Sequence, residues 1–505
     1  MTSLTERYAD RIRGVLSCFD RVVITGTIPD ICHPGAMAAH LRSRGTRLFD
    51  FPRFAEPLRD EIRENAERIA QENGLTIEFI RRNDFRKEER IKAIVAERGN
   101  HPGLVHIYSA MEPCPSFRPW HDKGTGQTSL KPTQAKCLHY YFYFILEDLG
   151  LCYLRVPTWA PFRLQFYFNG HHQLAALLAK RGIGYTLVDN VFTDIEDFAK
   201  AQRLADDVRI DRLHRRLDQL ARQYCPVIRH FRSHYHWSLM QVEYATDIIF
   251  PAVENLRPLY DEWSRTSIHA VKADNVATFL GRKLTGNYEG EIGNDFHTRI
   301  EGTRIKHTMG PLGIKMYDKL GRVLRIETTA NDVSCFQHHR KVEHRDGTSE
   351  IKNASVKKSI YSLPALREIM GAANRRYLEF LSALDDPTAG LAKLEKISHP
   401  IQEGQRTHRG FNLFHGPDLS VFETICRGEF TLRGFQNRHV REALGDRNGS
   451  QTSRLLKRLR SHGLIKKIGH TYRYYLTALG RTLTTTALVL RQMLVIPTLA
   501  NLPSP

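Results

Sequence analysis

The chain has 505 residues, of which 41% are hydrophobic and 26% charged, so it is long enough for three or four globular domains and too apolar to be disordered throughout. Its formal net charge of +19 favours an anionic partner, with nucleic acid ahead of an acidic membrane surface, although a basic soluble protein without such a partner is also compatible. Eight cysteines, none in a Cys-x-x-Cys pair, indicate neither a structural zinc site nor a disulfide framework.

The cellular location follows from what the sequence lacks. The first eight residues carry no apolar core of a signal peptide, and no run of about 18 apolar residues stands out. We therefore expect a cytoplasmic protein with reduced thiols, no transmembrane helix and no membrane partner. The composition leaves the oligomeric state open, a homo-oligomer included.

Residues 1–125 have a mixed α/β pattern. Strands and amphipathic helices are predicted at 19–28, 55–73, 75–80, 86–98 and 103–108. Asp20 lies at the start of the first strand, a position similar to that of the first metal-binding acid in RNase H-like nucleases. A carboxylate on the surface is the alternative interpretation of Asp20.

A Pro- and Gly-rich basic loop is predicted at 110–132, and its Phe117 and Trp120 could stack on bases beside Arg118 and Lys123. A flexible surface connection is the alternative. Residues 126–225 then form an aromatic unit of β-hairpin, helix and strand, followed by a helix with a basic face. The aromatic side chains fit either a core or a platform for stacking bases.

Residues 226–385 are predicted to form an α+β domain with an antiparallel sheet. His234 and His236 flank one residue, so on a strand both imidazoles project from one face, where they could share a divalent metal or serve a structural role. Glu243 and Asp247 lie four apart, on one face of a helix or convergent on a bulged strand.

Residues 314–329 read as two strands joined at Gly321. Alternation puts Lys315, Tyr317 and Lys319 on one face, and Arg325 with Glu327 on one face of the second strand. In a matching register these side chains share one patch. It could be the solvated face of a sheet or an active site for a polynucleotide.

The order of an acidic segment, Phe279-Leu-Gly-Arg-Lys, Ile314-Lys-Met-Tyr-Asp-Lys and Val323-Leu-Arg-Ile-Glu resembles the rolling-circle replication initiators of plasmids and phages, over residues 230–330. In that family acids hold Mg²⁺ or Mn²⁺, and a tyrosine attacks the scissile phosphate to give a 5′-phosphotyrosine link and a free 3′-OH. The whole chain is also similar to uncharacterised bacterial proteins of mobile elements.

The resemblance implies roles for particular residues. The metal would be held by members of the group Glu243, Asp247, Glu327, His234 and His236, and Lys319 and Arg325 would offset charge on the phosphate oxygens. No motif identifies the nucleophile. Tyr317 is a candidate, although its position within the matching strand argues for a structural role, and Tyr361 and Tyr377, on a later basic helical stretch, could supply the nucleophile instead.

After a polar linker at 386–415, residues 416–505 resemble a winged helix-turn-helix: two helices, a recognition helix at 451–462, and two strands around Gly469-His470. Residues 401–505 carry 16 Lys and Arg against six acids. The resemblance implies that the recognition helix contacts the major groove through Thr452, Ser453, Arg454, Lys457 and Arg458. It also implies that the wing contacts phosphates through Lys467, His470 and Arg473.

Together these patterns predict a multidomain α+β protein. The first hypothesis is a DNA-binding protein of a mobile or plasmid-like element whose central domain nicks DNA with Mg²⁺ or Mn²⁺. The alternative is a non-enzymatic DNA-binding regulator with a large sensor or oligomerisation region. A third interpretation is an RNA-binding protein that uses the aromatic strands of residues 138–168. The sequence does not decide whether the central domain is catalytic.

Overall fold

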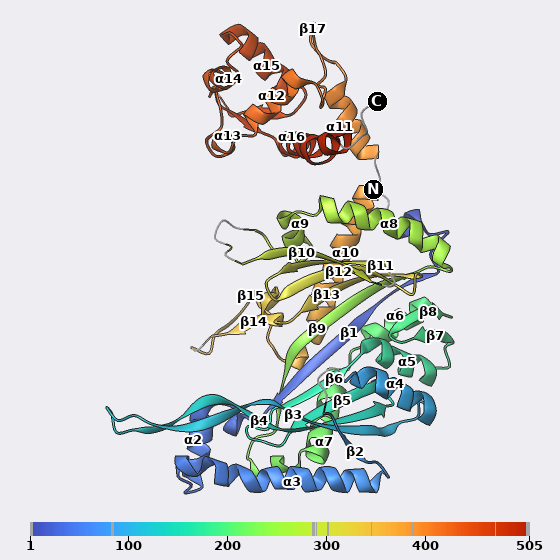
Figure 1. The fold of residues 1–505 in the computed structure, drawn as a ribbon, viewed down its shortest axis with the longest axis vertical. Helices are drawn as coiled ribbons and strands as arrows, with labels where there is room; N and C mark the ends of the chain where they lie inside the picture. The colour runs from blue at the N-terminus through green and yellow to red at the C-terminus, as the bar shows by residue number, and fades with distance from the viewer. Residues whose placement is uncertain are drawn as a thin grey trace. The chain divides into compact units, whose positions relative to one another are not determined.

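The computed structural model describes residues 4–81, 85–284, 288, 290–299, 302–344, 346–385, 388–469 and 471–500. The chain folds into two compact units, Met1–Asp385 and Asp386–Pro505. It is a mixed α+β protein with one large sheet, which lies in the first unit (Figure 1).

The sheet has eleven strands in the order β10-β11-β12-β13-β9-β1-β6-β5-β4-β3-β2. All neighbouring strands are antiparallel except β2 and β3. The strands are β1 (Gly14–Thr27), β2 (Ile77–Phe79), β3 (Gly103–His121), β4 (Thr128–Leu146), β5 (Gly150–Pro157), β6 (Leu164–Phe168), β9 (His236–Ile249), β10 (Ile292–Arg299), β11 (Gly302–Met309), β12 (Leu312–Lys319) and β13 (Val323–Ala330). The predicted regions 1–125, 126–225 and 226–385 therefore contribute strands to one sheet.

Helices cover both faces of this sheet. Those of the first unit are α1 (Leu4–Arg7), α2 (Pro34–Ser43), α3 (Phe51–Glu72), α4 (Lys87–Arg98), α5 (Gly170–Lys180), α6 (Phe198–Asp206), α7 (Ile210–Tyr224), α8 (Val253–Ala270), α9 (Ala273–Phe279) and α10 (Leu363–Asp385). The apolar sides of α3 and α7 pack with the inward residues of β1, β4 and β6 in the main core. On the opposite face, α4 packs on Tyr141 and Tyr143 of β4. The predicted helices 55–73 and 86–98 correspond to α3 and α4.

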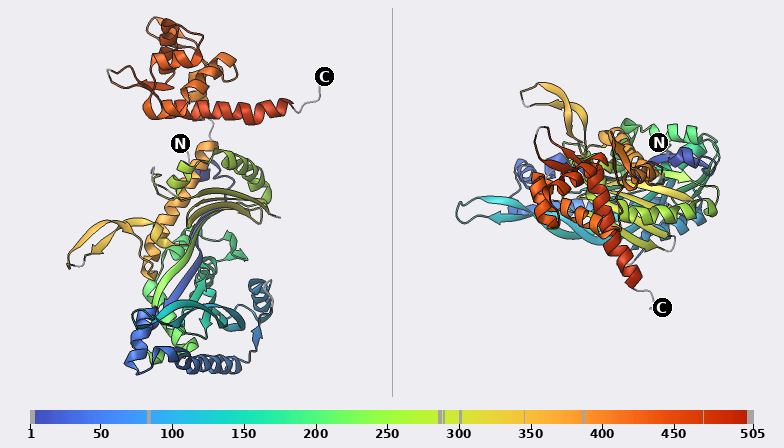
Figure 2. Two further views of the ribbon diagram at one scale, coloured as in Figure 1. Left: turned by 60° about the vertical axis from the view of Figure 1, so that its left-hand side comes forward. Right: turned by 90° about the horizontal axis from the view of Figure 1, so that it is seen from above.

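Two hairpins project from the first unit, β3–β4 and β14 (Gln337–Glu343)–β15 (Ser349–Ser355) (Figures 1 and 2). The loop predicted at 110–132 is largely the β3–β4 hairpin, and its Phe117 is a buried core residue that cannot stack on a ligand. The prolines at 113, 115 and 119 suggested a loop. They fit here because β3 is an edge strand of the described sheet beyond Ser109, where a missing N–H breaks no ladder.

The second unit contains α11 (Thr388–Ser398), β16 (Ile401–Glu403), β17 (Arg406–His408), α12 (Gly416–Ile425), α13 (Gly428–Arg433), α14 (Asn437–Leu444), α15 (Gly449–Ser461), β18 (Ile465–Lys467), β19 (Tyr474–Leu476), α16 (Ala478–Leu490) and α17 (Ile496–Ala500). Residues 386–415, predicted to be a linker, carry a helix and a short hairpin. Ile397 and Phe411 from this stretch pack in the core of the unit with Phe422, Leu456 and Leu459.

The helical segment Ala478–Ala500 is long and apolar enough to cross a membrane, and it is largely exposed. No transmembrane helix was expected, because no run of about 18 apolar residues stands out; Arg481, Arg491 and several threonines interrupt this segment. Length and composition alone do not distinguish a membrane span from other apolar helices.

Candidate metal centre

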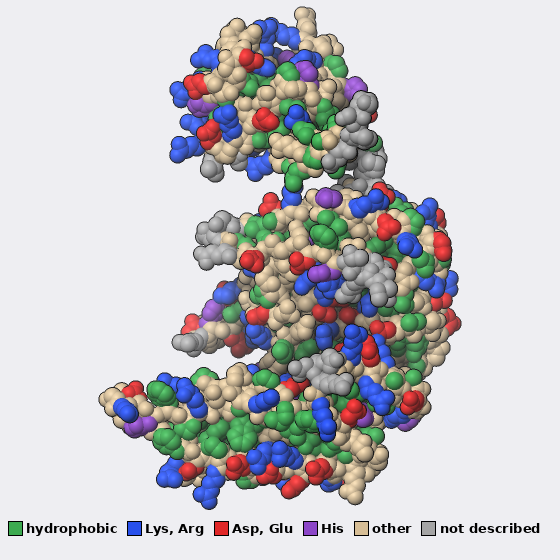
Figure 3. All heavy atoms as spheres, in the orientation of Figure 1, with side chains coloured by type: hydrophobic (Ala, Val, Ile, Leu, Met, Phe, Trp, Pro, Cys, Tyr) green, Lys and Arg blue, Asp and Glu red, His purple; other side chains and the backbone are tan. Residues whose placement is uncertain are grey.

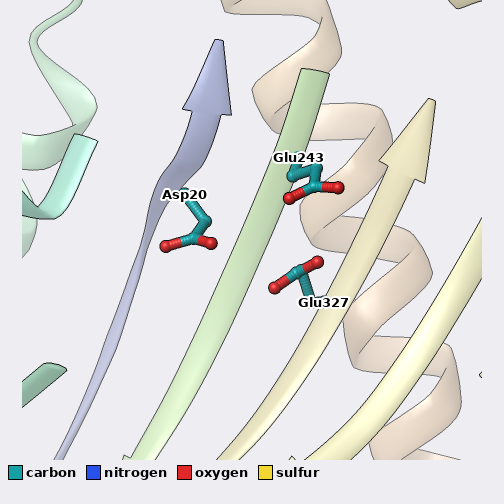
Figure 4. Close-up of side chains that lie close together, drawn as sticks. All are labelled: Asp20, Glu243 and Glu327. Atoms are coloured by element: carbon teal, nitrogen blue, oxygen red, sulfur yellow. The ribbon is translucent and has the colours of Figure 1, made fainter. Parts of the chain in front are cut away.

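Three neighbouring strands bring Asp20, Glu243 and Glu327 together at the middle of the sheet (Figure 4). Asp20 is on β1, Glu243 on β9 and Glu327 on β13, and one carboxylate oxygen from each lies within 4.8 Å of the others. All three residues are buried. Carboxylate oxygens at this spacing are ligands for a hard divalent cation such as Mg²⁺ or Mn²⁺. We call these three residues the acidic group.

Local strand geometry explains how the three carboxylates share a face. Glu243 is paired with Arg21 on one side and Thr329 on the other, and Glu327 is paired with Lys315. The ladder between β1 and β9 shifts between Phe19 and Arg21, which leaves Asp20 at a bulge. A bulge redirects a side chain without ending the strand, and such irregularities are common beside functional sites.

The hairpin predicted at 314–329 is confirmed, and its register brings the two polar faces together. Lys315 pairs with Glu327 and Tyr317 with Arg325 across β12 and β13, and Gly321 in the turn has φ of +65°. The patch is not the solvated face that was the alternative, because Tyr317, Arg325 and Glu327 are all buried. The surface interpretation of Asp20 is also wrong, since this residue is 7% exposed.

Lys315 and Tyr317 hold the carboxylates of the acidic group. The Lys315 ammonium lies 2.6 Å from Oε1 of Glu327 and 3.3 Å from Oε1 of Glu243. The Tyr317 hydroxyl donates a hydrogen bond of 2.5 Å to Oε2 of Glu327. Burial alone would lower the pKa of Lys315, but Glu327 and Glu243 raise it above its ordinary value, so the side chain stays charged.

Two groups at the centre, Glu243 and Tyr317, have pKa values raised by their surroundings. Burial, and then the neighbouring Glu327 carboxylate, raise the pKa of Glu243, although Lys315 opposes the shift. Burial and Glu327 also raise the pKa of the Tyr317 hydroxyl well above its ordinary value. Both shifts would be relieved by positive charge at the acidic group, because a cation favours the ionised forms.

Asp247, predicted as a metal ligand, lies outside the acidic group and is held by Arg325. The guanidinium binds it through two hydrogen bonds, 2.6 Å from Nε to Oδ1 and 2.7 Å from Nη2 to Oδ2. His171 of α5 lies 3.1 Å from the same carboxylate and 3.0 Å from Asp20. Although burial opposes the shift, Arg325 and His171 hold the pKa of Asp247 below its ordinary value.

Arg325 does not fit the predicted role of contacting a phosphate, because its side chain has no exposed surface and its guanidinium is already paired with two carboxylates. Besides Asp247, its guanidinium binds Asp20 at 3.2 Å and the backbone oxygen of Asn190 at 2.7 Å. Arg325 therefore fixes the position of the Asp20 carboxylate within the acidic group. Lys319, the other predicted cation, is partly exposed and donates a hydrogen bond of 3.0 Å to Asn190.

The remaining predicted residues of the first unit lie elsewhere. His234 and His236 are both exposed, and His236 pairs with Thr27, seven residues along β1 from Asp20. Exposed Tyr361 contacts His214 and Asp211 of α7 through its hydroxyl. Tyr377 is fully buried against His307. Of the three candidate nucleophiles, Tyr317 is the one in contact with the acidic group.

Sequence reasoning did not include the polar side chains around Asp20, namely Asn169, His171 and Asn190. Asn169 caps the N-terminus of α5 and donates a hydrogen bond to Asp20, and Asn190 donates one of 2.8 Å to the Asp20 carboxylate. The capping pattern of Asn169 is visible in the sequence, but nothing local links it to a strand 149 residues earlier.

The residues predicted to contact DNA in the second unit divide by exposure. Ser453, Arg454, Lys467 and Arg473 are exposed, and Lys457 is partly so. Thr452 is buried and donates a hydrogen bond to the backbone of Asn448. Arg458 is largely buried in an ion pair of 3.0 Å with Asp418, so it holds the core of this unit together. His470 lies outside the described residues.

Comparison of the chain with protein-family models, with curated proteins and with solved structures gives no match.

Proposed function

We propose that this protein binds DNA and cleaves one of its strands with a divalent cation, Mg²⁺ or Mn²⁺, held by Asp20, Glu243 and Glu327. The observation that carries the proposal is the convergence of these buried carboxylates, with their oxygens within 4.8 Å of one another. Three acids buried together repel one another and cost stability, a cost that a cation site explains.

The bound cation would polarise a phosphate and stabilise charge that develops on its oxygens. Tyr317 supplies the nucleophile: its oxygen bonds to phosphorus as the bond from phosphorus to the 3′ oxygen breaks. This leaves a 5′-phosphotyrosine and a 3′ oxyanion, which takes a proton from water to give the 3′-OH. Glu327 accepts the phenolic proton along the existing hydrogen bond. Lys319, beside the Tyr317 ring at 5.9 Å, offsets charge on the phosphate.

The charge distribution supports nucleic acid as the substrate. Lysine and arginine side chains are spread over both units on the face drawn in Figure 3. The outline of the first unit is hollowed between the β3–β4 and β14–β15 hairpins (Figure 3). At the end of β3–β4, Trp120 is 40% exposed and lies under the cations of Arg118 and Lys131, an arrangement suited to stacking beside a phosphate.

The second unit supports DNA binding as well. Its order of helices α12, α14 and α15 followed by the β18–β19 hairpin resembles a winged helix-turn-helix, in which α15 would enter the major groove. The exposed Ser453 and Arg454 would face the groove, and Lys467 and Arg473 would contact phosphates.

The experiment that tests the proposal incubates the full chain with a supercoiled plasmid library of host genomic fragments and with circular single-stranded DNA. We expect nicking with Mg²⁺ or Mn²⁺, none with EDTA, and a covalent protein–DNA adduct that the Tyr317→Phe variant does not form. Absence of nicking on every substrate would overturn the proposal.

One observation favours a second candidate, a DNA-binding regulator without catalysis. Lys315 already satisfies Glu243 and Glu327, so the acidic group is partly neutralised without a cation. Salt-sensitive DNA binding with no metal dependence and no nicking would favour this function.

Replacing Arg454 by Ala is expected to weaken DNA binding and to reduce the slope of log K against log salt by about one, because one phosphate or base contact is lost. Arg406→Ala is the matched control, since it removes the same charge from an exposed position on β17. Fluorescence anisotropy over a salt series measures both variants. Equal losses for the two would contradict a specific role for α15.

Binding of Mn²⁺ is expected to weaken as the pH falls, and to do so at a higher pH than for a site of ordinary carboxylates. The reason is that the pKa of Glu243 is raised, so the cation competes with a proton that is held more tightly. Calorimetric titration at several pH values measures this, and the Glu243→Gln variant should lose most of the pH dependence. An unchanged profile in that variant would exclude Glu243 as the titrating ligand.

A further inference from the structure

A cavity of about 1000 Å³ lies beside the metal centre, between the sheet and helices α4 and α5. Its sheet wall contains Tyr143 of β4, Tyr153 of β5 and Tyr167 of β6. Its polar end contains Asn169, Asn190 and Lys319. This volume is at the upper end of what small-molecule and cofactor sites occupy, so it would accommodate a group the size of a nucleotide.

The three tyrosines form a continuous aromatic wall. They are cross-strand partners in one row, with ring centroids 5.2 Å apart for Tyr143 and Tyr153 and 5.1 Å apart for Tyr153 and Tyr167. Burial raises the pKa of all three, so the rings are neutral phenols. Tyr153 and Tyr167 are only partly buried, and the guanidinium of Arg21 lies 5.4 Å from the Tyr167 ring. Such a wall favours a flat, aromatic ligand.

The polar end of the cavity contains two residues that directly contact Asp20 of the acidic group. Asn190 and Asn169 both donate hydrogen bonds to the Asp20 carboxylate, and Lys319 binds the side-chain oxygen of Asn190. Strand β6, which carries Tyr167, is the direct neighbour of β1, which carries Asp20. A ligand with its ring on the tyrosines would therefore hold an attached anionic group beside Lys319 and the metal centre.

We infer that this cavity takes one unpaired nucleotide of the DNA strand, next to the phosphate that is cleaved. The inference rests on the proposed function, because that function places a phosphate at the acidic group. An enzyme that acts at a single phosphate can fix the DNA strand in place by binding one nucleotide that has rotated out of the base stack. Aromatic side chains stack on the face of such a base whatever its sequence. The cavity therefore positions the strand.

The test measures binding of the full chain in EDTA, where metal-dependent cleavage does not proceed. The probes are a 20-nucleotide oligothymidylate, a strand of the same length without bases, and free thymidine monophosphate. We expect the oligothymidylate to bind more tightly than the strand without bases. Tyr153→Leu and Tyr167→Leu should weaken oligothymidylate binding about 5- to 100-fold and leave binding of the strand without bases unchanged.

Two further variants keep the test interpretable. Ala176→Phe fills the cavity from α5 without altering the tyrosines and should have the same effect as their loss. Tyr361→Leu removes an exposed tyrosine outside the cavity and should have none. An unchanged circular dichroism spectrum and an unchanged midpoint of urea unfolding show that each variant is folded.

Equal binding of the two strands by the wild-type chain would overturn the inference, even if nicking is observed. Tight binding of thymidine monophosphate, with no gain for the oligonucleotide, would overturn it in favour of a free nucleotide. Base-dependent binding that is lost in the tyrosine variants supports nucleotide binding in the cavity. If the wild-type chain shows such binding but does not nick any DNA, the cleavage proposal is wrong and the inference about the cavity stands.

Discussion

Replacing Glu327 by Gln is expected to lower metal-dependent cleavage by about two orders of magnitude or more. Loss of residues that only orient a metal ligand costs roughly 10- to 100-fold, and loss of a ligand itself should cost more. Gln keeps the shape of Glu327. With its oxygen toward Lys315, its NH2 group can donate to the Tyr317 hydroxyl, but the negative charge is removed. The fold should survive, because the substitution also relieves repulsion with Glu243.

The chain offers a matched control for this variant. Glu112 is a half-buried glutamate that accepts a hydrogen bond from Tyr141 and pairs with Lys87 and Arg155, surroundings similar to those of Glu327. It lies outside the acidic group. Glu112→Gln should leave cleavage near the wild-type rate, as measured by nicking under single-turnover conditions. Equal losses in Glu112→Gln and Glu327→Gln would point to a general effect of neutralising a glutamate.

Replacing Arg325 by Met is expected to destabilise the first unit by about 3–5 kcal/mol, because Asp20 and Asp247 would remain buried without the guanidinium that pairs with both of them. Met preserves much of the volume, so the effect reports the lost charge and hydrogen bonds. Arg13→Met, which removes an arginine from an exposed ion pair with Asp194, should hardly change the midpoint of urea unfolding.

The pH dependence of this loss identifies its cause. Asp20 and Asp247 have folded-state pKa values below the ordinary value of about 3.9, so their pairing stabilises the wild-type chain above that pH. That stability is lost as the pH falls toward the folded-state values. The difference between wild type and Arg325→Met should therefore shrink below about pH 4. A difference that is constant with pH would indicate lost packing instead.

Local patterns predicted the hairpin at 314–329 well. Alternation and Gly321 were enough to put Lys315 and Tyr317 on one face of the first strand and Arg325 and Glu327 on one face of the second, because strand period and turn position are properties of adjacent residues. The structure supplied the register that joins the two faces. The β3–β4 hairpin was missed because prolines 113, 115 and 119 are loop signals, and only the position of β3 at the sheet edge makes them compatible with a strand.

The membership of the acidic group could not be read from the sequence. Glu243 and Asp247 are separated by an even number of residues on β9, so alternation puts both side chains on one face of the strand. It does not say which of the two carboxylates Arg325 neutralises. That choice depends on His171 and on Asp20, which lies more than 220 residues before Glu243. Such contacts arise only when distant strands pair, and no local pattern encodes them.

The measurement that tests the central claim most directly is the number of Mn²⁺ ions bound by the full chain, read from the electron paramagnetic resonance signal of free Mn²⁺. We predict one ion per chain for wild type and for Glu112→Gln, and none at that site when Glu243 and Glu327 are both replaced by Gln. Equal binding by wild type and the double variant, or no binding by wild type, would contradict a metal centre at Asp20, Glu243 and Glu327.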